Sequence, residues 1–201
     1  MKIAKPLAKL IESFQKLPGI GPKTAQRLGF YLLHVPQDEL DYFADALSEL
    51  KKNTVLCRLC KNVSEEDPCP ICSDIKRDKS QIMVVGQPLD VLAFEKTGKY
   101  DGLYHVLHGT ISPLENIGPD EIYIKELIKR LGDNVLTEII IATNPTMEGD
   151  ATAMYLNKEI KKIGNSETIV SRLGMGIPTG ADLEYADETT LKESLDGRRK
   201  M

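Results

Sequence analysis

Tryptophan is absent from this chain of 201 residues, and aromatic residues together make up only 5% of it. A recognition surface built mainly from stacked aromatic rings is therefore not expected. No stretch approaches the roughly 20 apolar residues of a membrane-spanning helix, and no secretory segment opens the chain. The phosphate-binding loop GxxxxGKS or GxxxxGKT is also missing, so ATP hydrolysis is not expected.

The remaining composition is that of a globular protein, with 41% hydrophobic and 28% charged residues, and indicates one or two compact units. The formal net charge of −4 does not favour nucleic acid, but the charge is unevenly distributed. Residues 1–30 contain six Lys or Arg residues and one Glu, so this segment is basic within an acidic chain. Such a segment can bind phosphates or can simply be a solvated helix face.

Cysteine is scarce, and all four cysteines fall within 57–72 as two CxxC pairs. Two such pairs supply four thiolates in the tetrahedral arrangement of a closed structural zinc site. The short segment around them is too small to bury a core without a metal. Two disulfides, a redox CxxC pair and an iron–sulfur cluster are the alternatives, and a reducing compartment disfavours the disulfides. We therefore predict zinc ligands at Cys57, Cys60, Cys69 and Cys72.

A tight hairpin is predicted between two helices near the N-terminus. Apolar residues recur at helical spacing through 6–16, with Leu17 continuing the stripe, and a second helix begins near Pro22 with Leu28, Tyr31 and Leu32 inside. The intervening sequence LPGIG resembles the helix-hairpin-helix motif, in which backbone amides at a helix N-terminus bind a nucleic-acid phosphate. A bland turn between two packed helices is the alternative. The predicted DNA-binding residues are Gly19, Gly21, Lys23 and Arg27.

Strands and helices alternate in the second half of the chain, which predicts an α/β fold with a parallel sheet flanked by helices. A third helix over about 38–52 precedes the cysteines, with Leu40, Phe43, Leu47 and Leu50 as its expected buried stripe. Strands are expected at 81–85, 104–107, 138–142 and 168–173, and helices at 88–96, 119–131, 150–163 and from about 187.

Two acidic residues, Glu148 and Asp150, follow the third of these strands. Ligands of such sheets bind at the carboxyl ends of the strands. The pair could hold Mg²⁺ through water, or could supply negative charge to the N-terminus of the next helix. The spacing alone does not separate these interpretations.

Taken in order, the hairpin, the four cysteines and the α/β unit resemble the RecR family of bacterial recombination mediators, whose α/β part is a Toprim domain. Further segments carrying the resemblance are GLYHVL, ISPL, IGP, ATNPT and GDATA. It implies a helix-hairpin-helix region over 1–53, a C4 zinc finger over 54–80, a Toprim domain over 81–166 and a C-terminal region over 167–201. It also implies a cytoplasmic, nucleoid-associated protein of DNA repair and not an enzyme. Such a protein forms a dimeric or tetrameric ring and acts with RecO and RecF to help load RecA at single-stranded gaps.

One position departs from the Toprim pattern, which usually places a glutamate at the end of its first strand. This chain has Gly86 there, so Mg²⁺ at Glu148 and Asp150 is doubtful. The alternative function is a magnesium-dependent nuclease, primase or topoisomerase-like enzyme, and an interaction scaffold without DNA contact is a third. The C-terminal strand is weakly similar to a Walker B strand, but the glycine-rich loop and helix after it are more simply a fold-completing or oligomer element.

Overall fold

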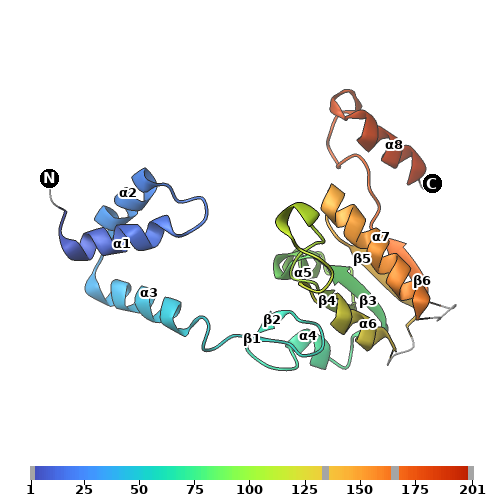
Figure 1. The fold of residues 1–201 in the computed structure, drawn as a ribbon, viewed down its shortest axis with the longest axis horizontal. Coiled ribbons are helices and arrows are strands. Elements are labelled where there is room, and N and C mark those ends of the chain that lie inside the picture. The colour runs from blue at the N-terminus through green and yellow to red at the C-terminus, as the bar shows by residue number, and fades with distance from the viewer. Residues whose placement is uncertain (1–2, 133–135, 164–167, 199–201) are drawn as a thin grey trace. The chain divides into compact units, whose positions relative to one another are not determined.

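The computed structural model describes residues 3–132, 136–163 and 168–198. The chain divides into two compact units, residues 1–53 and 54–201 (Figure 1). No helix within the described residues is long and apolar enough to cross a membrane.

The first unit contains three helices: α1 (Lys5–Gln15), α2 (Pro22–Leu32) and α3 (Gln37–Glu49). Its core lies between α1 and α2 and consists of Leu7, Ile11 and Ala25, with Phe14 and Ile20 packed against it. Gly29 permits this close packing, because a Cβ there would lie 2.9 Å from Ile11. Proline begins or nearly begins both helices, where its missing N–H costs nothing.

The expected buried stripe on α3 is wrong. Phe43, Leu47 and Leu50 are exposed to 44%, 61% and 59%, and no residue of α3 is fully buried. Helical periodicity predicts an apolar face correctly but does not supply a partner for it, and the small core between α1 and α2 does not reach α3. Leu17 and Tyr31, expected on the inner side, are exposed for the same reason.

The second unit begins with the cysteine segment, which we call the knuckle (residues 54–74). It contains an antiparallel pair, β1 (Val55–Leu56) and β2 (Val63–Ser64), and a short helix, α4 (Pro70–Ser73). The peptide bond before Pro68 is cis. Ile71 of α4 packs against both the cysteines and the sheet core, so the knuckle is seated on the larger part of this unit.

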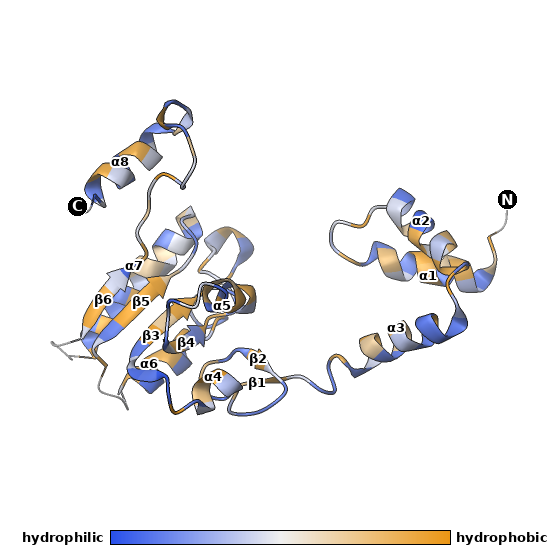
Figure 2. Ribbon diagram, turned by 180° about the vertical axis from the view of Figure 1, so that it is seen from behind, coloured by the Kyte–Doolittle hydropathy of each residue, from blue (hydrophilic) through white to orange (hydrophobic). Residues whose placement is uncertain are grey.

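A four-stranded parallel sheet in the order β4-β3-β5-β6 forms the rest of the unit (Figure 1). Residues 82–85 and 139–142 in the middle of this sheet are apolar, which Figure 2 shows in orange, because helices cover both faces there. The strands are β3 (Asp78–Val85), β4 (Gly102–Val106), β5 (Glu138–Ala142) and β6 (Ile169–Arg172). The connecting helices are α5 (Pro88–Glu95), α6 (Ile124–Gly132) and α7 (Met147–Lys162).

The two faces of this sheet have separate cores. Met83, Val85, Tyr104 and Val106 pack with α5 on one face. Ile82, Val84, Ile139 and Ile141 pack with α6 and α7 on the other. The predicted doubly wound parallel sheet is therefore confirmed.

Two short 3-10 helices and one α-helix complete the second unit. The first, η1 (Pro113–Glu115), lies between β4 and α6. After β6, the chain passes through η2 (Leu183–Tyr185) to the last helix, α8 (Glu188–Asp196). The helix expected from about residue 187 is therefore confirmed.

Two helix starts differ from expectation. The helix predicted from residue 119 begins only at Ile124. Residues 118–123 form turns instead, because the Gly118 N–H donates to the Glu121 carboxylate at 2.8 Å and the Tyr123 N–H donates to the Leu107 carbonyl at 3.0 Å. In the other direction, α7 begins at Met147, three residues before the predicted start at Asp150, because Thr146 caps it.

Candidate nucleic-acid interface and metal centre

The hairpin between α1 and α2 is built on two glycines with different roles. Gly19 has a left-handed backbone with φ +79°, which an L side chain rarely adopts. Gly21 precedes α2 with φ −80° and ψ 170°, an extended conformation open to any residue. No atom lies within 4 Å of a Cβ placed on Gly21. The fold therefore requires glycine at position 19 but not at 21, and Gly21 leaves the amides at the start of α2 uncovered.

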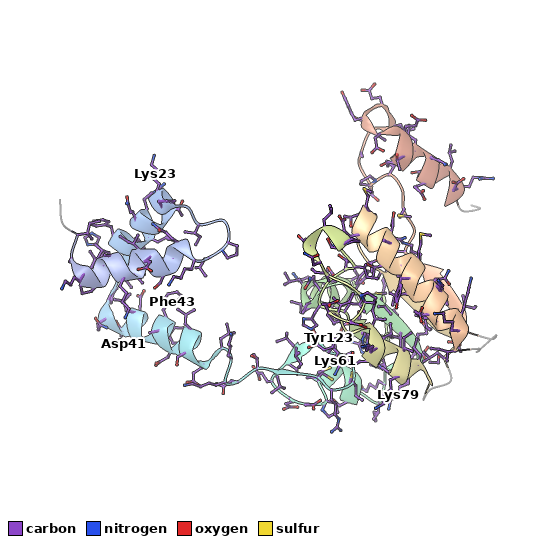
Figure 3. All side chains as sticks on the ribbon, in the orientation of Figure 1. Lys23, Asp41, Phe43, Lys61, Lys79 and Tyr123 are labelled. Carbon is purple, nitrogen blue, oxygen red and sulfur yellow. The ribbon has the colours of Figure 1, made fainter. Side chains whose placement is uncertain are left out.

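Lys23 and Arg27 lie four residues apart in α2, and both are exposed. Neither belongs to an ion pair among the residues that the structure describes. Lys23 projects outward from the first turn of α2 (Figure 3). The N-terminus of α2 thus combines two exposed cations with the positive end of a helix dipole, which is suited to an anion. Whether these four residues bind DNA stays a prediction.

The four cysteines converge in the knuckle. All are buried, and their sulfur atoms lie within 4.8 Å of one another. The Cys60 and Cys69 sulfurs are 3.5 Å apart, too far for a disulfide and close to the spacing of about 3.8 Å that Zn–S bonds of about 2.3 Å give at tetrahedral geometry. Backbone bonds fix the turn after the first pair, since the Lys61 N–H donates to the Cys57 carbonyl and the Cys57 N–H to the Asn62 carbonyl.

The thiol chemistry fits a dication. Hydrogen bonding from Cys60 lowers the pKa of Cys69, whereas hydrogen bonding with Cys69 raises the pKa of Cys60, and hydrogen bonding with Cys60 raises the pKa of Cys72. Four sulfurs this close cannot all be thiolates unless a cation compensates their charge. A closed set of four soft ligands is a structural zinc site, with no position left for a substrate.

The acidic pair lies in the first turn of α7, at the carboxyl edge of the sheet. Gly149 between the two acids is needed for close packing, because a Cβ there would lie 1.9 Å from the Asn144 carbonyl oxygen. Asp150 is ion-paired with Arg172 at the end of β6, and Glu148 is half-buried. A cavity of about 430 Å³ is lined by Asp150 and Arg172, together with Thr143 after β5, the 173–176 segment and α8. The sequence did not predict Arg172, because the pairing depends on β5 and β6 being neighbours.

Gly86 directly follows β3 beside this edge and is buried. A Cβ there would make only ordinary contacts, 3.6 Å from an Asp90 carboxylate oxygen and 3.9 Å from the Gly109 carbonyl oxygen. Apart from the cysteines, no cluster of three metal-ligating side chains occurs in the described residues. Asp150 is ion-paired with Arg172, and Gly86 contributes no carboxylate beside Glu148 and Asp150.

The hairpin, the zinc knuckle and the sheet together define a helix-hairpin-helix protein with a structural zinc and a Toprim domain. Four family models match in this order: the RecR helix-hairpin-helix (residues 7–51), the RecR zinc finger domain with four cysteines (54–74), the Toprim domain (80–173) and the RecR C-terminal model (176–199). A curated relative from Heliobacterium modesticaldum (strain ATCC 51547 / Ice1), "Recombination protein RecR", is 52% identical over 198 residues, which cover 98% of each chain. The chain belongs to the RecR family of recombination proteins.

Proposed function

We propose that this chain is a mediator of recombinational DNA repair that clamps DNA without reading its sequence. The observation that carries the proposal is the hairpin: uncovered amides at the start of α2, flanked by Lys23 and Arg27. Such groups bind phosphate and do not reach base edges. The predicted binding is therefore independent of base sequence and weakens steeply with salt. DNA contact would place the protein in the bacterial cytoplasm, at the nucleoid.

One hairpin is a weak contact, because non-specific phosphate binding typically has a dissociation constant of about 10⁻⁴ to 10⁻⁶ M at physiological salt. Several hairpins in a symmetric homo-oligomer would raise the affinity through effective concentration. The exposed apolar face of α3, with Tyr42, Phe43 and Leu47, supports an assembly in which another surface covers it. We propose a dimer or tetramer that forms a ring around DNA.

The proposed role of this clamp is to act with RecO and RecF and to help load RecA at single-stranded gaps. The carboxyl edge of the sheet, with Glu148 and Asp150, is the proposed contact for a partner or for DNA. The ion pair between Asp150 and Arg172 supports a recognition surface over a catalytic magnesium site. We therefore propose that the protein is not an enzyme.

Fluorescence anisotropy of a labelled gapped duplex over a salt series tests this function. The double variant Lys23→Ala/Arg27→Ala should weaken binding by more than about tenfold and reduce the salt slope by nearly two, because two phosphate contacts are lost. Lys5→Ala/Lys9→Ala on α1 removes the same charge and is the matched control. If the hairpin variant binds as tightly as the original protein, the hairpin is not the DNA contact.

A further inference from the structure

A second cationic site lies within the second unit, where the knuckle meets the end of β4. The Val106 N–H donates to the Cys60 carbonyl at 2.8 Å, and His108 Nε2 lies 2.6 Å from the Lys61 carbonyl oxygen. Because a carbonyl only accepts, His108 Nε2 carries the proton. These two contacts fasten the loop after β4 to the turn after the first CxxC pair.

Both residues of the second contact have an unusual backbone. Lys61 has φ 61° and His108 has φ 60°, the left-handed region that costs a residue with a side chain about 1 kcal/mol or more. Two such residues meet here on segments 47 residues apart, which indicates that the surrounding structure fixes the Lys61 backbone in this conformation.

The Lys61 side chain lies over an aromatic ring and not beside an acid. Its Nζ is 5.3 Å from the centroid of the Tyr123 ring, and Figure 3 shows the two residues close together. The His108 ring packs edge-on against the same tyrosine, with ring centroids 5.3 Å apart. Among the described residues, Lys61 makes no ion pair within 4 Å. Arg130 of α6 lies nearby, and its guanidinium donates to the Tyr104 carbonyl at 2.6 Å.

The positive charges around this contact also lower the pKa of the buried His105. The pKa of His105 is lowered to about 4, chiefly by burial and also because Arg130, Lys61 and His108 repel the proton. This local excess is notable because residues 54–201 contain 18 Lys and Arg against 24 Asp and Glu. Lys61 is part-buried over an aromatic ring and has no acidic partner within 4 Å among the described residues, so its charge is available to an anionic ligand.

We propose that Lys61 binds a backbone phosphate of nucleic acid, with His108 and Tyr123 as the residues that position it. The inference rests on the proposed function, since a second phosphate contact in each chain would add to the weak contact that each hairpin makes. The contact adds affinity and no sequence preference.

Lys61→Asn tests the proposal, because asparagine tolerates the left-handed backbone and keeps the carbonyl that His108 contacts. Binding of the full-length variant to a labelled single-stranded oligonucleotide is measured by anisotropy over a salt series. The salt slope should fall by about 0.7 and the dissociation constant should rise several-fold. Lys158→Asn on α7, an exposed lysine without a described ion pair, is the matched control and should leave both unchanged. Zinc content and melting temperature confirm that both variants fold.

The outcomes separate this inference from the proposed function. If the original protein binds DNA and loses binding in the hairpin variant, yet Lys61→Asn behaves like Lys158→Asn, the second contact is absent while the proposed function stands. If the original protein does not bind DNA at all, both fail. Inorganic phosphate, added at the concentration of the oligonucleotide phosphates, distinguishes a nucleic-acid site from a site for free phosphate. If it displaces the oligonucleotide from the original protein but not from Lys61→Asn, Lys61 binds free phosphate and the assignment to nucleic acid is wrong.

Discussion

In the hairpin, substitution of Gly19 should affect stability, whereas substitution of Gly21 should affect DNA binding. Gly19→Ala should lower the free energy of unfolding by about 1 kcal/mol, because alanine is strained at φ +79°. Gly21→Ala should change it by less than about 0.5 kcal/mol, since the backbone there suits any residue and the space is open. The added methyl group of Gly21→Ala nevertheless stands before the amides of α2 and should weaken DNA binding. Urea denaturation and anisotropy measure the two effects, and a Gly21→Ala variant that binds normally would contradict phosphate approach at this point.

A part-buried hydrogen-bond network connects Arg77, just after the knuckle, with Glu95 and Tyr104. Arg77 donates to both Glu95 carboxylate oxygens and to the Gly102 carbonyl, and the Tyr104 hydroxyl donates to Glu95 at 2.7 Å. The Arg77 and Glu95 side chains are only 15% and 29% exposed. Arg77→Ala leaves the carboxylate half-desolvated without its counter-ion and should cost about 2 kcal/mol of stability. Thermal or urea unfolding at pH 7 measures this, with Lys76→Ala, an exposed neighbour, as the control.

The same network makes stability depend on pH. The hydrogen bonds from Arg77 hold the pKa of Glu95 below its ordinary value of about 4.3. As the pH falls, Glu95 is therefore protonated in the unfolded chain before it is protonated in the folded protein. Its contribution to the free energy of unfolding is fully present above a pH of about 4.3 and is lost as the pH falls through the lowered pKa. Glu95→Gln should flatten the acid limb of the stability curve, and an unchanged limb would show that other carboxylates dominate it.

Elements were predictable to different degrees, and the reasons are physical. The strand expected at 138–142 is β5 to the residue, because a short apolar run between polar turns has few other solutions. The turn at 118–123 was missed because it is fixed by contacts to Glu121 and to the distant Leu107. In the site, the cysteine spacing alone predicted the metal ligands, whereas the pairing of Asp150 with Arg172 follows from strand order, which local sequence does not encode.

Loss of zinc from the knuckle should also loosen the adjoining end of β4. Removing zinc leaves four repelling or protonated sulfurs in a segment without another core, so the knuckle should unfold. The Val106 amide then loses its acceptor, the Cys60 carbonyl, and should lose protection from hydrogen exchange. The Ile140 amide, in the middle of the sheet, should stay protected. Chelation with metal release confirmed by a dye, followed by exchange measurements, checks this. Retained protection at Val106 would mean that the knuckle keeps its shape without metal.

At the scale of the whole molecule, the small first unit leaves an apolar surface that its own core does not use. Leu47 is 61% exposed on α3, so Leu47→Glu should change the stability of an isolated chain little but should introduce a charge into any interface on this face. We expect the variant to sediment as a smaller species than the original protein. Ser48→Glu places the same charge one residue away, on the polar side of the helix, and should leave the sedimentation coefficient unchanged. If Leu47→Glu keeps the original assembly, the oligomer contact lies on another surface of the protein. The DNA affinity of the variant would then show whether DNA binding depends on the apolar face of α3.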